Sequence, residues 1–114
     1  MTETYIEDAL QALRISRRYA GRRQLAEAVR LALEDDSRLL RMDRQIFGPT
    51  AALCGGTSGS VARNIRTVAC RTWTQHPELL RQMAGLPLDG PPTASELVEI
   101  LLTHIQRTRR QARR

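Results

Sequence analysis

The segment that most restricts how this chain can fold runs from Pro49 to Trp73 and has the sequence PTAALCGGTSGSVARNIRTVACRTW. A glycine pair separates a short helical pattern from a longer one. At about 100° per residue, one side of the longer pattern collects Val61, Ile65, Val68, Ala69 and Thr72. The opposite side collects Gly59, Ser60, Arg63, Arg66, Thr67 and Cys70, and has no carboxylate. This arrangement predicts a helix-turn-helix, whose second helix enters the major groove of DNA.

The distribution of charge supports this hypothesis. The net charge is +6, and all 18 basic residues are arginines. Residues 1–43 hold eight arginines and eight acids, residues 44–77 hold four arginines and no acid, and residues 78–114 hold six arginines and four acids. The helix-turn-helix segment is therefore free of negative charge, as a phosphate-facing surface requires. Arginine suits bidentate contacts with phosphate and guanine, although codon bias in a GC-rich genome would also explain the absence of lysine.

The rest of the chain predicts helices and no strand. Helical spacing of apolar residues predicts helices over 4–14 and 22–33, and a third helix that Ser37 caps and that carries Leu39, Leu40, Met42 and Ile46. A brief helix from Pro49, a long helix that ends at about Gln75 and a short helix over 77–83 follow. The last helix begins at the capping box Thr93–Glu96. We expect Gly48-Pro49 to break the chain between two helices. The fold class is therefore all-α, a compact bundle of about six helices with a central helix-turn-helix. We expect a single domain over 1–114, with frayed tails at about 1–3 and 108–114.

Several functional classes find no support in the sequence. Cys54 and Cys70 have neither metal-ligand spacing nor a disulfide framework, so a reducing cytoplasm fits best. His76 and His104 are isolated, and no acid–base or nucleophile–base pair is present, so we do not expect an enzyme. We expect no cofactor and no metal. No apolar run approaches the length of a membrane span, and the acidic start differs from a secretion signal, so we expect no membrane association.

Several motifs occur in an order and at separations that match a known family. They are Gly21 followed by LAEAV (25–29), DSRLL (36–40), Gly48-Pro49, VARNIR (61–66) ahead of Trp73, and PTASE (92–96). Over roughly residues 6–108 the chain resembles the C-terminal DNA-binding domain of the stage-zero sporulation protein A family, the master regulators of bacterial sporulation. The resemblance implies binding to short DNA boxes, often as head-to-tail pairs on tandem boxes. Arg63 holds the position of the arginine that recognises a guanine in this family, and Arg66 matches a second arginine.

Three positions depart from the family pattern. Ala62 replaces a glutamate that helps recognise the base sequence, Gly59 replaces a serine, and Thr67 replaces a histidine. Because Ala62 cannot accept a hydrogen bond from a cytosine amino group, we expect one base preference to be lost or relaxed. The target box therefore need not be the family's box.

The expected DNA contacts follow from the helix pattern and the resemblance together. We expect base contacts from Arg63, Arg66, Ser60, Gly59 and Thr67, and backbone contacts from Thr50, Gly56, Thr57, Ser58, Arg71, Arg109 and Arg110. The arginine-rich end of the chain could equally be a frayed, solubilising tail.

The leading hypothesis is a transcription regulator that binds a specific double-stranded DNA box. The chain begins almost at the first helix of the family's effector domain, so we expect a free-standing effector without a receiver domain. Expected partners are DNA, a head-to-tail homodimer on tandem boxes, and RNA polymerase or a full-length regulator. The expected location is the cytoplasm, in association with the nucleoid. One alternative is a protein-interaction module that kept the fold but lost specific recognition of DNA, and another is non-specific nucleoid binding through arginine charge.

Overall fold

The computed structural model describes residues 2–113. The described residues form six α-helices, one 3-10 segment and one π-helical segment, and no strand. They are α1 (Thr2–Ala12), α2 (Ala20–Glu34), η1 (Asp36–Arg41), η2 (Asp43–Phe47), α3 (Gly48–Cys54), α4 (Ser58–Gln75), α5 (Pro77–Ala84) and α6 (Ala94–Ala112). The prediction of an all-α fold is confirmed.

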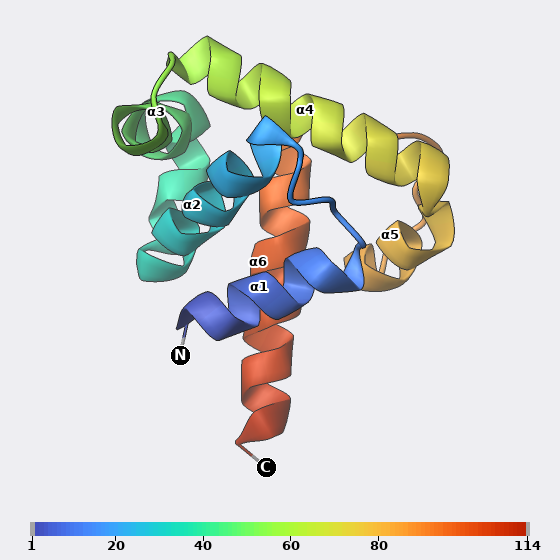
Figure 1. The fold of residues 1–114 in the computed structure, drawn as a ribbon. Coiled ribbons are helices and arrows are strands. Elements are labelled where there is room, and N and C mark those ends of the chain that lie inside the picture. The colour runs from blue at the N-terminus through green and yellow to red at the C-terminus, as the bar shows by residue number, and fades with distance from the viewer. Residues whose placement is uncertain (1, 114) are drawn as a thin grey trace.

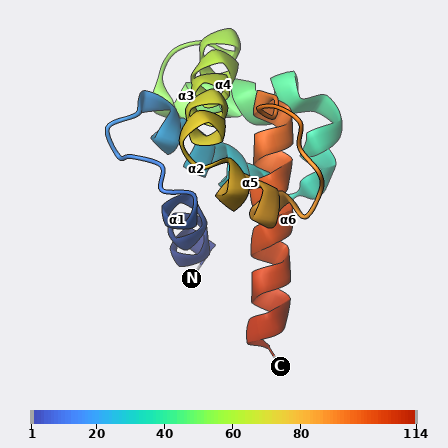
Figure 2. The same ribbon diagram turned by 90° about the vertical axis from the view of Figure 1, so that its right-hand side faces the viewer.

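Helix α6 is the axis around which the other helices pack (Figure 1). Helices α1, α2, α4 and α5 all contact it, and α4 lies across one end of the bundle. The opposite end of α6 extends away from α4, and this arrangement is also visible after a quarter turn (Figure 2). Both ends of the described chain therefore lie on the side of the molecule away from α4.

The core is aliphatic, as the scarcity of aromatic residues predicts. Helices α1, α2, α4, α5 and α6 contribute apolar side chains spaced three or four residues apart, and the fully buried ones include Leu10, Leu25, Val29, Ile65, Leu97 and Leu101. The apolar side of α4, consisting of Val61, Ile65, Val68, Ala69 and Thr72, is buried as predicted. Trp73 is only half-buried, and the Arg81 guanidinium lies 4.7 Å from the centre of its ring.

A close helix crossing joins the first turn of α2 to the middle of α4. A Cβ atom added at Gly21 would lie 2.5 Å from the carbonyl oxygen of Asn64 and 2.9 Å from a methyl group of Val68. Only glycine allows the two backbones to come this near. The Asn64 side-chain amide also donates a 3.0 Å hydrogen bond to Gln24 on α2. This crossing fixes the orientation of α4 relative to the core.

The segment between α2 and the glycine turn differs from the predicted pair of separate helices. It winds continuously from the 3-10 turns of η1 through the π-helical turn of η2 into α3, which begins at Gly48. Gly48-Pro49 therefore starts the next helix as predicted but does not break the one before it. The cap is Asp35, whose carboxylate accepts from the amide of Ser37. Leu40, predicted on an apolar side, is 85% exposed. Because 3-10 and π turns have periods other than 3.6 residues, a helical-wheel assignment fails in this segment.

The final helix begins at the predicted capping box, in which Thr93 and Glu96 exchange hydrogen bonds. Helix α6 continues to Ala112, so residues 108–112, which we expected to fray, are helical. Met1 and Arg114, at the ends of the two expected tails, lie outside the described residues. No helix in the described range 2–113 is both long and apolar enough to cross a membrane.

Candidate nucleic-acid interface

The exposed side of α4 is basic and carries no acid. We call it the outward face, and it consists of Gly59, Arg63, Arg66, Thr67, Cys70 and Thr74. Arg63 and Arg66 are both exposed, and no Asp or Glu occurs anywhere in α4. The Nε of Arg66 lies 3.4 Å from the sulfur of Cys70, and the Thr67 hydroxyl donates to the carbonyl oxygen of Arg63 at 3.1 Å. This bond orients the Thr67 side chain along the helix.

The start of α4 is fixed by a reciprocal cap. The backbone amide of Ser60 donates to the Thr57 hydroxyl at 3.1 Å, and the amide of Thr57 donates to the Ser60 hydroxyl at 2.9 Å. The preceding turn depends on glycine, because Gly55 and Gly56 have φ values of +92° and +88°. The cap residue of α4 is Thr57.

Three predicted contact residues near this turn have hydroxyl groups that are already engaged. Those of Thr57 and Ser60 form the cap, and that of Ser58 donates to the carboxylate of Asp43. What this turn can offer an anion is its amides, because those of the first helical turn precede the first intrahelical hydrogen bond, from Val61 to Thr57. The sequence also missed that Asp43 places a negative charge beside the start of α4.

Thr50 has to be removed from the set of expected backbone contacts. Its side chain is fully buried in α3, with 0% exposure, and its hydroxyl oxygen has no hydrogen-bond partner among the described residues. A hydroxyl group inside the bundle cannot reach a phosphate outside it. Thr50 contributes to packing beneath the turn instead.

Arg71 lies beside the outward face, on the flank where α2 packs. It is exposed, and its guanidinium is 5.0 Å from the centre of the Tyr19 ring, within the range of a cation–π contact. Tyr19 is the residue just before α2. The contact therefore joins the basic side of α4 to the α1–α2 connection.

The structure does not bring Arg109 and Arg110 together with the other predicted contacts. Both lie near the end of α6 that extends away from α4 (Figure 1). The Arg109 guanidinium is 5.9 Å from the ring of Tyr5 on α1. A DNA segment that docks against α4 therefore lies at the other end of the molecule from these two arginines.

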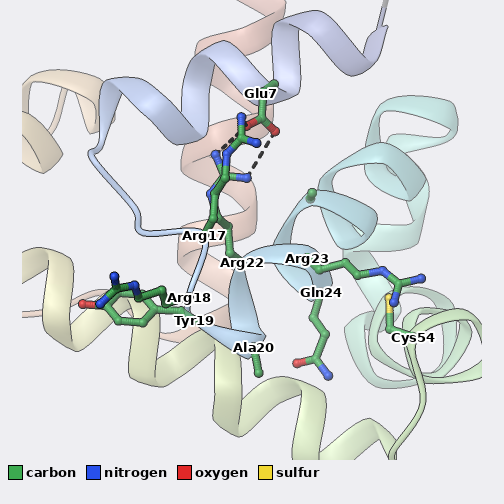
Figure 3. Close-up of a pocket in the computed structure, with 10 residues that line it drawn as sticks. Glu7, Arg17, Arg18, Tyr19, Ala20, Arg22, Arg23, Gln24 and Cys54 are labelled. Atoms are coloured by element: carbon green, nitrogen blue, oxygen red, sulfur yellow. Dashed lines mark hydrogen bonds and ion pairs between the residues drawn. The ribbon is translucent and has the colours of Figure 1, made fainter.

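A second group of arginines, which the sequence interpretation overlooked, surrounds an open depression of about 670 Å³ between α1, the α1–α2 connection, α2 and Cys54 at the end of α3 (Figure 3). Its lining includes Arg17, Arg18, Arg22 and Arg23, with Glu7 as the sole acid among the lining residues. We call it the basic depression. The signal was present, because residues 9–26 hold five arginines and no acid. Because arginines and acids balance over residues 1–43 as a whole, a charge count over that range does not reveal the arginine-rich stretch.

One of these arginines is structural. The buried Arg22 binds Glu7 through two nitrogens, at 2.6 and 3.2 Å, and donates from Nε to the carbonyl oxygen of Ile15 at 3.0 Å. These bonds fasten the α1–α2 connection to both helices. The hydrogen bonds from Arg22 lower the pKa of Glu7, and Arg17, 3.3 Å away, adds a smaller favourable charge. The carboxylate of Glu7 is therefore held ionised and largely neutralised.

Among residues 2–113, no group of three or more His, Cys, Asp and Glu side chains is placed to hold a metal ion.

Comparison with known proteins gives one match. The model of a family described as the C-terminal domain of sporulation initiation factor Spo0A matches residues 6–105. No curated protein and no solved structure matches the chain.

Proposed function

Because the chain belongs to the family of Spo0A C-terminal, DNA-binding effector domains, we propose that it regulates transcription by recognising a specific short box of double-stranded DNA. The observation that carries the proposal is the outward face of α4. Two exposed arginines and several small residues lie there, on a helix that has no acidic residue and whose opposite side is buried in the core. Such a face suits insertion into the major groove.

The proposed base contacts divide among three side chains. Arg63, at the centre of the outward face, donates to O6 and N7 of a guanine, and Arg66 makes a second contact one turn along. The methyl group of Thr67 is suited to an apolar contact with a thymine methyl, because its hydroxyl is bound to the carbonyl of Arg63. Ala62, half-buried at the margin of the face, offers no acceptor for a cytosine amino group. We therefore expect a box with one relaxed position.

The proposed backbone contacts surround these. The amides of Ser58 and Gly59 in the first turn of α4 face one phosphate, and the neighbouring amide of Gly56 extends the same concave turn. Gly59 has no side chain, which allows the helix to approach the DNA closely. Arg71 contacts the phosphate strand on the α2 flank.

We further propose head-to-tail pairing of two copies on tandem boxes, action in the cytoplasm on nucleoid DNA, and contact with RNA polymerase or a full-length regulator.

The test is selection of binding sites from a random duplex library at physiological salt, with the wild type, Arg63→Ala and Arg113→Gln in parallel. Arg113 is an exposed arginine at the far end of α6 and serves as the matched control. We expect the wild type and the control to enrich one motif that contains guanine, and Arg63→Ala to lose preference at a single position. A good bidentate pair contributes about 1–3 kcal/mol of base discrimination, so the loss should be roughly 5–150-fold at that base.

Other results would favour the alternatives. Enrichment of no motif by the wild type, combined with strong binding that salt weakens, would indicate non-specific nucleoid binding. Absence of binding to any duplex would favour a protein-interaction module, an alternative that the substitutions at Gly59, Ala62 and Thr67 motivate. An unchanged motif in Arg63→Ala would contradict the assigned role of that residue while leaving specific binding intact.

A further inference from the structure

The basic depression carries more positive charge than its internal ion pairs neutralise. Glu7 is engaged by Arg22 and Arg17. In the range 2–113, no ion pair or hydrogen bond from the Arg18 or Arg23 side chain is present. Both side chains are exposed. Figure 3 shows them on opposite sides of the α2 start, Arg18 beside Tyr19 and Arg23 extending toward Cys54. Two unpaired cations therefore border one concave surface.

The position of the depression relative to α4 limits what can occupy it. The start of α2 crosses α4 at Gly21, which is too close for any side chain, and Tyr19 contacts Arg71 of α4. The residues that line the depression are thus rigidly attached to the flank of the recognition helix. When a helix lies in the major groove, the two phosphate strands pass along its flanks. On this flank of α4, Arg71 contacts Tyr19, and the start of α2 follows directly.

We propose that the basic depression binds the phosphate backbone of DNA beside the box, with Arg18 and Arg23 as the phosphate ligands. This inference rests on the proposed function only in that α4 docks in the major groove. Arg71, fixed against Tyr19, continues the contact from the outward face of α4 into the depression. The DNA that the protein covers therefore extends beyond the base pairs that α4 contacts, on the α2 side of the helix.

A DNA strand explains the depression better than an acidic protein segment does. The positive charge is continuous with the basic outward face through Arg71 and Tyr19, so one polyanion can occupy both surfaces at once. The Glu7–Arg22 bridge also holds the α1–α2 connection in place before any ligand binds. Because the connection is already ordered, phosphate binding there costs little loop entropy.

The experiment measures how the dissociation constant depends on salt for Arg18→Gln, Arg23→Gln and the double variant, with Arg113→Gln as control. Each phosphate contact contributes about 0.9 to the slope of log affinity against log salt. We expect the double variant to lose about 1.8 units of slope, so that its deficit in affinity relative to the wild type shrinks about 12-fold between 50 and 200 mM salt. The loss should be the same on the selected box and on a scrambled duplex, and the selected motif should not change. Arg113→Gln should retain the wild-type slope.

The outcomes separate this inference from the proposed function. An unchanged slope in the double variant, with the wild type still enriching a motif, overturns the basic depression as a DNA site and leaves the proposed function standing. A reduced slope on every duplex, with no motif enriched by the wild type, supports the depression and overturns specific recognition. A change of motif in the double variant overturns the assignment of Arg18 and Arg23 to phosphate. Thermal unfolding of each variant shows that the exposed substitutions leave the fold intact.

Discussion

The crossing of α2 and α4 predicts that Gly21→Ala destabilises the protein, against the usual effect of this substitution in a helix. A Cβ atom at this position would lie 2.5 Å from the Asn64 carbonyl oxygen, whereas ordinary contacts begin at 3.4 Å. The obstacle is backbone, so it cannot rotate away, and α2 must move from α4 by about 0.9 Å. The same shift would disturb the Gln24–Asn64 hydrogen bond.

The expected magnitude is the balance of two effects. Overpacking of a tight site typically costs about 1–3 kcal/mol. Replacing glycine by alanine in a helix returns about 0.4–1 kcal/mol, because the unfolded chain loses conformational freedom. The difference of these ranges is about 0–2.6 kcal/mol. Because the obstacle is backbone, we expect a net loss of about 1–2 kcal/mol in the free energy of unfolding, within this range. For a domain of this size, Tm should fall by roughly 4–12 °C.

Urea unfolding followed by circular dichroism measures this change, and Gly90→Ala is the matched control. Gly90 lies in the loop before α6, and an added Cβ there meets no atom within 4 Å. The control should unfold at the wild-type urea concentration or slightly above it. If Gly21→Ala were as stable as Gly90→Ala, the two helices would have room for a side chain and the argument from backbone contact would be refuted.

Three further predictions concern α4, α3 and the α1–α2 connection. Gly59→Ala should stabilise the fold by roughly 0.4–1 kcal/mol in urea unfolding, because an added Cβ meets nothing nearer than 3.9 Å. The same variant should weaken DNA binding in a titration, because under the proposed function the added methyl group lies between α4 and the DNA. Tighter binding would contradict close approach at this residue. Thr50→Val should raise the free energy of unfolding by about 1 kcal/mol, because it removes a buried hydroxyl group without a partner, and should leave DNA affinity unchanged; a loss of affinity would restore Thr50 to the interface. The folded-state pKa of Glu7 lies below its unfolded value, so its bond with Arg22 stabilises the protein at pH values above the unfolded pKa, and this stability is lost as pH falls through the folded pKa. Glu7→Gln should therefore flatten the decline of Tm on acidification. An unchanged dependence of Tm on pH would exclude this contribution.

The sequence predicted the buried side of α4 correctly, and the outward side except for the half-buried Ser60. It could do so because α4 is a regular helix of 18 residues, over which a period of 3.6 residues is well defined. It was wrong about Leu40, which lies in 3-10 turns. It was also wrong about Thr50, because a helix of seven residues is too short to show which side faces the core. The cap at Thr93 was found because a capping box is a local pattern, with both partners within three residues.

Parts of the candidate interface depend on contacts between distant residues, which no local pattern reveals. Asp43 reaches the start of α4 from 15 positions earlier in the chain, and η2 carries it there. Arg18 and Arg23 lie beside α4 because Gly21 lets α2 cross it closely. A count of charge in shorter windows would have identified the arginines at residues 9–26. Only the fold shows which of these arginines bind Glu7.

Both ends of the described chain lie on the side of the bundle away from α4 (Figures 1 and 2). An affinity tag, a fluorophore or an entire folded domain attached at either end would therefore extend away from α4. Such fusions should bind DNA as the unmodified chain does, which suits the protein to surface immobilisation through either terminus. Under the proposed function, the same geometry allows another module to be joined at either end while the outward face of α4 stays accessible.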